Sequence, residues 1–275
     1  MSGLRATLLL ALSFALLVVA LGWALVFFGQ RSLLFPGSRA FGTVGPEDVG
    51  GERLWLDADG ARTEAWLLPA LDGARGPLVV YAHGNGELID HWVEAFEPAR
   101  ARGVTALLVE YPGYGRSDGS PSETSIRAAM TAAFDFAVRE RGFDASRVVG
   151  WGRSLGGGAI CALARERPLA ALVLESTFTS TVQMARLFGL PPSLARLLVR
   201  DRFDNLALLR RFSGPVLLLH GEHDEIIPPS HAQALHDNSP ASELYWLPCG
   251  HNDCARPWPP VLRFLAAHGL LGGPP

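Results

Sequence analysis

The sequence predicts an α/β fold built on a mostly parallel, doubly wound sheet. Continuous apolar runs, of the kind found in strands that are buried on both faces, alternate with stretches of helical character. The runs lie at 78–82, 104–109, 147–150, 171–174 and 216–219. Helices are expected at 122–141, 157–167 and 257–268, and one more strand at 243–247. Ligands bind such sheets at the carboxyl ends of the strands, so the residues that follow each run are the first candidates for function.

Two further strands are expected before the parallel part of the sheet. Residues 53–57 and 63–68 alternate between apolar and polar side chains on either side of Asp59 and Gly60. This pattern indicates an antiparallel hairpin.

The amino-terminal segment has the composition of a membrane anchor. Residues 6–30 carry no charge, and 8–28 are almost wholly apolar, which is long enough for a helix to cross a bilayer. Aromatic residues gather toward one end, as at membrane interfaces: Trp23, Phe27 and Phe28. A cleaved signal peptide is the alternative, but 26–31 lacks the small residues of a cleavage site. We expect a single-pass anchor over 1–31, and too few flanking charges to orient it.

The rest of the chain reads as one domain. Residues 32–51 form a connector containing Gly and Pro, 52–271 are of normal size for one α/β domain, and 272–275 form a frayed tail. Residues 178–212 are too long for a simple connection between strands, so we expect a small helical cap there. Its apolar residues favour a lipophilic substrate, although they could equally pack the cap onto the domain: Leu187, Phe188, Leu190, Leu194, Leu197, Leu198 and Val199.

Charge and cysteine content exclude several classes of function. The net charge of −3 gives no basic field for nucleic acid, so no nucleic-acid partner is expected. Three cysteines do not make a disulfide scaffold. Cys161 is expected in the core. Cys249 and Cys254 flank His251 without a second pair at zinc-ligand spacing, so no metal is expected, while a disulfide between them stays open.

The pentad from Gly152 to Gly156 has the form Gly-x-Ser-x-Gly and follows a β-branched run. This is the pattern of a nucleophile elbow, in which Ser154 would sit on a sharp strand-to-helix turn and glycines two residues away would avoid clashes. A glycine-rich turn is one alternative. A dinucleotide-binding loop is another, but Leu155 stands where that motif requires its third glycine.

A serine nucleophile needs a base, and the base needs an acid that orients it. After the run 216–219 we choose Asp224 as the acid, with Glu222, Glu225 and Glu175 as its rivals. After the strand at 243–247 we choose His251 as the base. The order Ser, Asp, His is that of strand-end triads on parallel sheets.

Two backbone N–H groups should stabilise the negative oxygen of a tetrahedral intermediate. One is expected from Leu155, directly after the serine. The other is expected from Asn85, in a glycine-flanked loop that follows the run 78–82.

Together these motifs resemble the α/β-hydrolase superfamily, and more closely its membrane-anchored subfamily of depalmitoylase-like proteins and bacterial homologues. The resemblance runs through 83–86, 110–117, 119–123, 152–157, 175–180, 203–205, 220–228 and 250–253. Glu110 and Pro112 depart from the Asp and Arg of many members. The resemblance implies the α/β-hydrolase fold preceded by one transmembrane helix, whereas the small helical cap is expected from the length of 178–212.

We therefore expect a serine hydrolase of carboxylic esters or thioesters that needs no cofactor. Ser154 would be the nucleophile, His251 the base and Asp224 its orienting acid. A peptidase or amidase could use the same residues, and a cofactor-free perhydrolase is a further alternative. A catalytically silent, membrane-anchored binding protein is the alternative outside enzymes.

Overall fold

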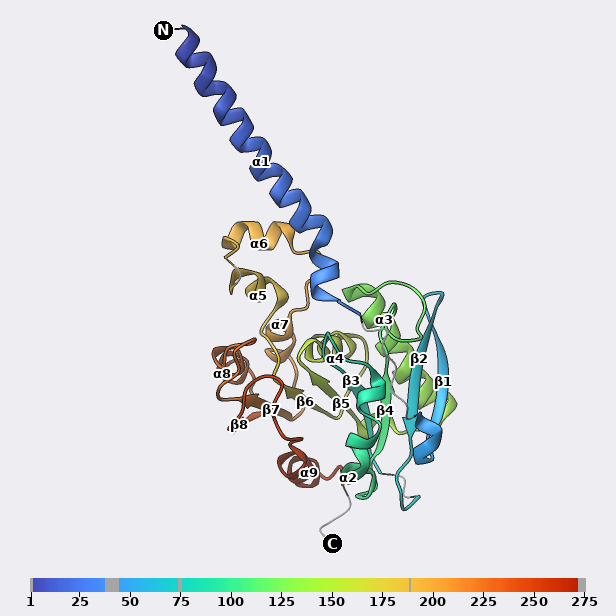
Figure 1. Ribbon diagram of the computed structural model, residues 1–275. Helices are drawn as coiled ribbons and strands as arrows, with labels where there is room; N and C mark the ends of the chain where they lie inside the picture. Colours follow the sequence, from blue (N-terminus) through green and yellow to red (C-terminus); the bar gives the residue numbers. More distant parts are fainter. Residues whose placement is uncertain (1, 38–44, 74–75, 188, 272–275) are drawn as a thin grey trace.

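The computed structural model describes residues 2–37, 45–73, 76–187 and 189–271 (Figure 1). Its centre is an eight-stranded sheet with the order β1-β2-β4-β3-β5-β6-β7-β8. The strands are β1 Glu52–Ala58, β2 Ala61–Leu68, β3 Leu78–Ala82, β4 Thr105–Val109, β5 Val148–Arg153, β6 Ala171–Glu175, β7 Val216–Gly221 and β8 Ser242–Leu247. The mostly parallel sheet predicted from the apolar runs is confirmed, since every pair from β4 to β8 is parallel.

The antiparallel hairpin is also confirmed. Strands β1 and β2 pair from Glu52 and Leu67 to Ala58 and Ala61, and β2 then pairs antiparallel with β4. Asp59 and Gly60 form the turn with positive φ angles of 52° and 82°.

Helices cover both faces of the sheet (Figure 1). The helices are α2 Glu97–Arg100, α3 Glu123–Asp135, α4 Leu155–Glu166, α8 Ser230–Asp237 and α9 Trp258–Ala267. Successive side chains of a strand point to opposite faces, and β3 shows this directly. Leu78 and Val80 belong to one core with α3 and α4, whereas Val79 and Tyr81 belong to a second core with α2 and α9. Single helical turns are η1 Pro46–Val49, η2 Ile89–His91, η3 Glu94–Phe96, η4 Phe136–Glu140 and η5 Ala145–Arg147.

Three boundaries near the pentad and in the helix expected over 122–141 differ from the sequence prediction. Strand β5 continues past 150 to Arg153, where it still pairs with Glu175, and α4 begins at Leu155 rather than at Gly157. The glycines of the pentad therefore belong to regular structure, and the change of direction is confined to Ser154. The helix expected over 122–141 is α-helical only as far as Asp135. The next five residues form the π-helical turn η4.

The segment between β6 and β7 contains three short helices, α5 Thr181–Leu187, α6 Pro192–Leu198 and α7 Asn205–Leu209. Its two ends meet in a bridge between Ser180 and Asp204. Figure 1 shows α5 and α6 standing off the sheet beside the lower end of the first helix, α1 Ser2–Leu34. We refer to 178–212 as the cap, within which Phe188 lies outside the described residues.

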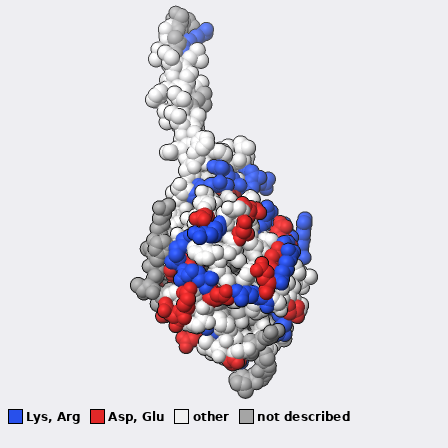
Figure 2. Space-filling view, turned by 90° about the vertical axis from the view of Figure 1, so that its right-hand side faces the viewer, with Lys and Arg blue, Asp and Glu red and all other residues white. Residues whose placement is uncertain are grey.

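Helix α1 Ser2–Leu34 projects from the domain (Figure 1). It continues three residues past the expected boundary at 31. Within Leu9–Leu34, a window of 18 residues reaches a mean hydropathy of 2.6, and by length and composition this segment is able to cross a membrane, a property that it shares with signal sequences. Figure 2 shows a surface almost free of charged side chains along most of this helix. The expected tail, 272–275, lies outside the described residues.

Candidate active site

Ser154 occupies the turn between β5 and α4, with φ 53° and ψ −115°. A non-glycine residue at positive φ is strained and persists only where its surroundings hold it. Here the Ser154 N–H donates to the Glu175 carbonyl at 2.8 Å, and its carbonyl accepts from Thr177 Oγ1 at 2.7 Å. Both ends of the strained residue are thus fixed to β6 and the residues that follow it.

The two glycines of the pentad allow this turn to pack closely. A Cβ atom on Gly156 would overlap the carbonyl group of Ala82 in β3, and one on Gly152 would overlap the backbone of Gly156. The clash predicted from the sequence is confirmed, and it comes from a neighbouring strand as well as from the turn itself.

The structure brings Ser154, His251 and Asp224 together in a single hydrogen-bonded row. His251 Nε2 lies 3.1 Å from Ser154 Oγ, and His251 Nδ1 lies 2.7 Å from Asp224 Oδ2. All three side chains are buried. Their donors and acceptors match when the His251 proton is on Nδ1, which leaves Nε2 free to accept from the serine.

Asp224 is held as a carboxylate. Burial acts to raise its pKa, but hydrogen bonds from His251 and Ile227, with the charges of His251 and His220, together lower it. Its Oδ1 accepts the N–H groups of Ile226 at 3.0 Å and Ile227 at 2.7 Å. The acid is therefore oriented by the backbone on one side and by His251 on the other.

The rival acids lie elsewhere. Glu222 is exposed. Glu225 accepts the backbone N–H of His251 at 3.3 Å rather than facing its ring. Glu175 lies 3.7 Å from Arg153 Nε and accepts from Trp151 at 3.2 Å.

Asn85 and Leu155 both line the cavity that contains Ser154. Leu155 is the first residue of α4, where an N–H group has no acceptor within the helix. Tyr114 Oη donates a hydrogen bond of 2.9 Å to the main-chain carbonyl of Asn85, and this contact holds the Asn85 loop in place. The oxyanion roles of these two N–H groups stay predictions.

The same loop begins at a buried ion pair between His83 and Glu110. His83 Nε2 lies 2.7 Å from Glu110 Oε1, and His83 Nδ1 lies 2.7 Å from the carbonyl of Gly84. Burial alone would lower the His83 pKa, but the charge and hydrogen bond of Glu110 raise it. Acceptors face both nitrogens of the His83 ring, an arrangement that favours its protonated form.

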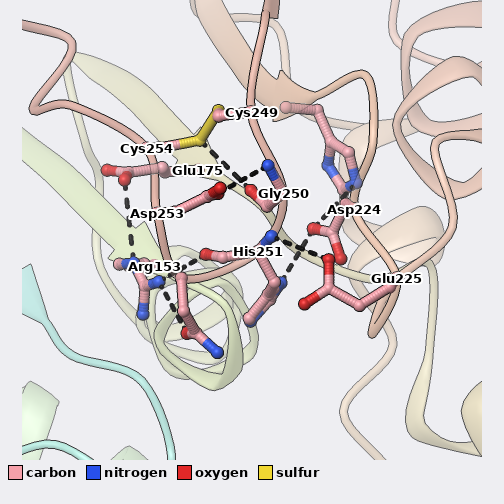
Figure 3. The surroundings of a disulfide bond; sticks show 11 residues. Arg153, Glu175, Asp224, Glu225, Cys249, Gly250, His251, Asp253 and Cys254 are labelled. Carbon is pink, nitrogen blue, oxygen red and sulfur yellow. Dashed lines mark hydrogen bonds and ion pairs between the residues drawn. A yellow bond between two sulfur atoms is a disulfide. The ribbon is translucent and has the colours of Figure 1, made fainter.

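Sequence reasoning missed Arg153 and Glu87, which connect three parts of the site. Arg153 donates from Nη2 to the His251 carbonyl at 2.7 Å and to Asn252 Oδ1 at 3.2 Å (Figure 3). Its Nη1 pairs with Glu87 Oε1, and Glu87 Oε2 accepts the Gly84 N–H at 2.8 Å. The ion pair of Arg153 and Glu87, together with these hydrogen bonds, thus connects the serine turn, the loop at 83–87 and the loop that carries His251. The sequence offered one signal of this role, which is that the residue directly before Ser154 in the Gly-x-Ser-x-Gly pentad, Arg153, is charged.

Cys249 and Cys254 form a disulfide around His251 (Figure 3). Gly250 within this small loop donates its N–H to Asp253 Oδ1 at 2.6 Å. The pairing that the sequence left open is present, and it closes the loop that carries the histidine. Cys161 is buried as expected, and burial raises its pKa to about 12.

A cavity of about 760 Å³ opens over Ser154 and His251. Its walls are mainly apolar and come from the cap, from the loop after β7 and from α1: Val26, Leu34, Phe178, Met184, Leu198 and Ile226. Of the apolar cap residues singled out in the sequence, Leu190, Leu198 and Val199 line it, whereas Leu187 and Leu197 are exposed to solvent. Its volume is typical of sites for small molecules.

Within the part of the chain that the structure describes, no three His, Cys, Asp or Glu side chains gather as a metal site. That the reaction needs no metal or cofactor stays a prediction.

Comparison with known proteins places the chain in a family. Residues 79–266 match the model of the alpha/beta hydrolase family. The chain belongs to the alpha/beta hydrolase family. It is 32% identical over 207 residues to the alpha/beta hydrolase domain-containing protein WAV2 of Arabidopsis thaliana, covering 69% of this chain and 67% of that protein. It is also 32% identical over 197 residues to an uncharacterized protein of Mycobacterium tuberculosis, covering 71% and 70%.

Solved structures share the α/β-hydrolase fold. The Pyrococcus furiosus esterase Pf2001 superposes with a TM-score of 0.69 at 16% identity, covering 85% of this chain and 97% of the esterase. An alpha-beta hydrolase from Vibrio vulnificus gives 0.69 at 18% identity, covering 89% and 91%. At this identity the likeness concerns the fold alone. Because the chain belongs to the alpha/beta hydrolase family, the comparison supports hydrolase activity in general.

Proposed function

We propose that this protein is a serine hydrolase that cleaves carboxylic esters or thioesters through an acyl-enzyme intermediate. The observation that carries the proposal is the row in which Ser154 Oγ faces His251 Nε2 at 3.1 Å while His251 Nδ1 faces Asp224 Oδ2 at 2.7 Å. A hydroxyl is a weak nucleophile, and a base at hydrogen-bond distance with an oriented tautomer activates it.

In the first half of the reaction, Ser154 Oγ attacks the acyl carbonyl carbon while its proton passes to His251 Nε2. The carbonyl oxygen becomes an oxyanion, which the N–H groups of Asn85 and Leu155 stabilise. Asp224, ionised at neutral pH, stabilises the imidazolium that forms. The bond from carbon to the leaving oxygen or sulfur then breaks, and His251 returns the proton to that atom.

In the second half, His251 removes a proton from water. The water oxygen attacks the acyl carbon, and the bond to Ser154 Oγ breaks. Ser154 recovers its proton from His251, and the carboxylic acid leaves. Each proton transfer uses only the residues of the row, the leaving group and water, and the N–H groups of Asn85 and Leu155 stabilise the oxyanion in both halves.

The proposed substrate carries a lipophilic acyl group. The cavity over Ser154 is walled mainly by aliphatic and aromatic side chains, which suit an acyl chain better than a polar peptide. This lining favours ester or thioester cleavage over the amide cleavage that the same three residues could perform.

The proposal is tested with a fluorophosphonate probe on the full-length protein. Wild type should be labelled, and Ser154→Ala should not. Because a non-catalytic binding protein has no activated serine, absence of labelling in folded wild type would favour that alternative. A series of p-nitrophenyl esters, thioesters and anilides on the same preparation separates the esterase, thioesterase and amidase activities.

We also propose that α1 holds the domain at a membrane. Its span of 26 residues, Leu9–Leu34, fits the thickness of a bilayer. If so, the protein should stay in the membrane pellet after alkaline carbonate extraction, with its first residues still present in the intact mass. A mature protein that begins after residue 30 would identify the segment as a cleaved signal.

A further inference from the structure

The lower end of α1 is fixed to the cap by polar contacts. Arg31 donates to the buried Asp201 through Nε at 2.8 Å and Nη2 at 3.0 Å. Gln30 Nε2 donates to the Leu198 carbonyl at 3.0 Å, and Gln30 Oε1 accepts the Arg200 N–H at 2.9 Å. Four hydrogen bonds thus set both the rotation and the height of the helix against the segment that follows α6.

This docking turns one face of α1 toward Ser154. Val26, Gln30, Leu33 and Leu34 line the same cavity as Ser154 and His251. Their spacing of four, three and one residues places them on one side of a helix. Since α-helical residues rise 1.5 Å each, this wall runs about 12 Å along α1 from Leu34 to Val26.

The upper part of this wall belongs to the segment that is apolar enough for a bilayer. Val26 lies well inside the span Leu9–Leu34, whereas Leu34 lies at the domain. Leu33 has a side chain that is 77% exposed, so the cavity wall is continuous with the outer surface of the helix. A chain that entered beside Val26 would meet apolar side chains of α1 and the cap before it reached Ser154.

We propose that the last turns of α1 form one wall of the acyl-chain site, and that the chain of a bilayer-embedded ester or thioester reaches Ser154 along this wall. The inference rests on the proposed function and names the source of its substrate. Because apolar groups lose free energy when they leave hydrocarbon for water, a path lined by α1 and the cap removes the step in which the acyl chain would be exposed. Val26 and Leu33 then determine which chain lengths fit.

Substitution of Val26 by Trp in the full-length protein, reconstituted in phosphatidylcholine nanodiscs, tests this wall. Filling the upper end of the cavity should lower the ratio of kcat/KM for hexadecanoyl over butanoyl p-nitrophenyl esters by about tenfold or more, since a misfit of even one methylene in an apolar pocket has effects of this order. Leu33→Trp, at an exposed rim position that avoids disturbing the docked helix, should shift the ratio in the same direction.

Leu25→Trp is the matched control. Leu25 neighbours Val26 on α1, is 76% exposed and is not among the residues that line the cavity. It should leave the ratio at the wild-type value. Equal chain-length profiles for Val26→Trp, Leu33→Trp and Leu25→Trp would overturn the proposal.

A binding measurement separates this proposal from the proposed function. In the Ser154→Ala background, a fluorescent hexadecanoyl ester should bind more weakly, by about tenfold, when Val26→Trp is added and unchanged when Leu25→Trp is added. This result would uphold the acyl wall even if wild type hydrolysed no ester. Equal binding in both double variants would contradict it even if hydrolysis were established.

The source of the chain is tested with the same Ser154→Ala protein in liposomes. A fluorescent phospholipid with two hexadecanoyl chains, which exchanges slowly between vesicles, is placed either in the protein's own bilayer or in separate vesicles. Binding that depends on Val26 should occur only when probe and protein share a bilayer. Equal binding from separate vesicles would show that the chain arrives through water and would overturn entry along α1.

Discussion

Arg153 Nη2 donates a hydrogen bond of 2.7 Å to the main-chain carbonyl of His251, so the residue before the proposed nucleophile holds the backbone of the proposed base. The guanidinium of Arg153 also pairs with Glu87. The distance between Ser154 and His251 therefore depends on a side chain that itself contacts neither Ser154 Oγ nor the His251 ring.

Arg153→Lys should lower kcat with little change in KM for a short ester. Lysine keeps the charge but lacks the planar fork that reaches Glu87 and the His251 carbonyl together. Loss of a hydrogen bond from a charged group, about 1.5–3 kcal/mol, corresponds to roughly 10- to 100-fold in kcat. Steady-state kinetics check this, with Arg139→Lys as a control because the Arg139 side chain is 73% exposed. A rise in KM alone would assign Arg153 to binding rather than positioning.

Asp224→Asn should lower kcat by about 10³- to 10⁴-fold. The N–H groups of Ile226 and Ile227 would keep donating to the amide oxygen, which turns the amide NH₂ toward His251 Nδ1. The imidazole proton then moves to Nε2, and the ring no longer accepts a proton from Ser154. Glu225→Gln should retain activity within a few-fold, because Glu225 accepts the His251 backbone N–H rather than facing the ring. Full activity in Asp224→Asn would return the acid role to one of the rival carboxylates.

Gly156→Ala should destabilise the protein and abolish probe labelling. The added Cβ would overlap the Ala82 carbonyl group in β3. Forcing a methyl group into a packed site costs about 1–3 kcal/mol, which thermal unfolding would report as a lower Tm. Gly86→Ala is the control, because a Cβ there meets open space. An unchanged Tm for Gly156→Ala would show that the turn has room for a methyl group beside Ala82.

The buried pair of His83 and Glu110 should make stability depend on pH above about 6.5. The folded-state pKa of His83 is raised above its ordinary value of 6.5. The contribution of this pair is therefore fully present below about pH 6.5 and is lost as pH rises through the raised pKa. Unfolding measured across this range should show a falling alkaline limb in wild type and a flatter one in His83→Gln. Identical alkaline limbs would mean that His83 is neutral when folded.

Removal of the disulfide should lower turnover as well as stability. The bond between Cys249 and Cys254 closes a loop of only a few residues, so its entropic effect on the unfolded chain is smaller than that of a disulfide that closes a long loop. His251 lies inside that loop, and freeing it should lower kcat by about tenfold, because the base must be held in place to act. The double variant Cys249→Ser and Cys254→Ser tests this against Cys161→Ser. A large fall in Tm with unchanged kcat would contradict it.

Much of the site was predictable because local sequence patterns mark the strand ends at which its residues lie. Ser154, Asp224 and His251 each follow a recognisable apolar run, and parallel strands bring such positions to one edge of the sheet. The rivals of Asp224 could be separated only by side-chain direction, which the sequence does not encode locally. The helical start at Leu155 was missed because glycines weaken a helical pattern even where packing makes them helical.

The contacts of α1 were beyond sequence reasoning for a different reason. Arg31 and Asp201 are 170 residues apart, and neither belongs to a periodic pattern that would pair them. The same holds for Arg153 and Glu87, 66 residues apart. A long apolar segment predicts a span, but its contact with the cap becomes visible only once the cap is placed over the sheet.

The central claim is that Ser154 carries the acyl group during turnover. Wild-type protein mixed with p-nitrophenyl butyrate, quenched in acid during the initial burst and digested, should give one peptide whose mass has increased by a butanoyl group, with the adduct on Ser154. Ser154→Ala should give no adduct and no turnover. An adduct on another residue, or ester hydrolysis at the wild-type rate in Ser154→Ala, would contradict the account.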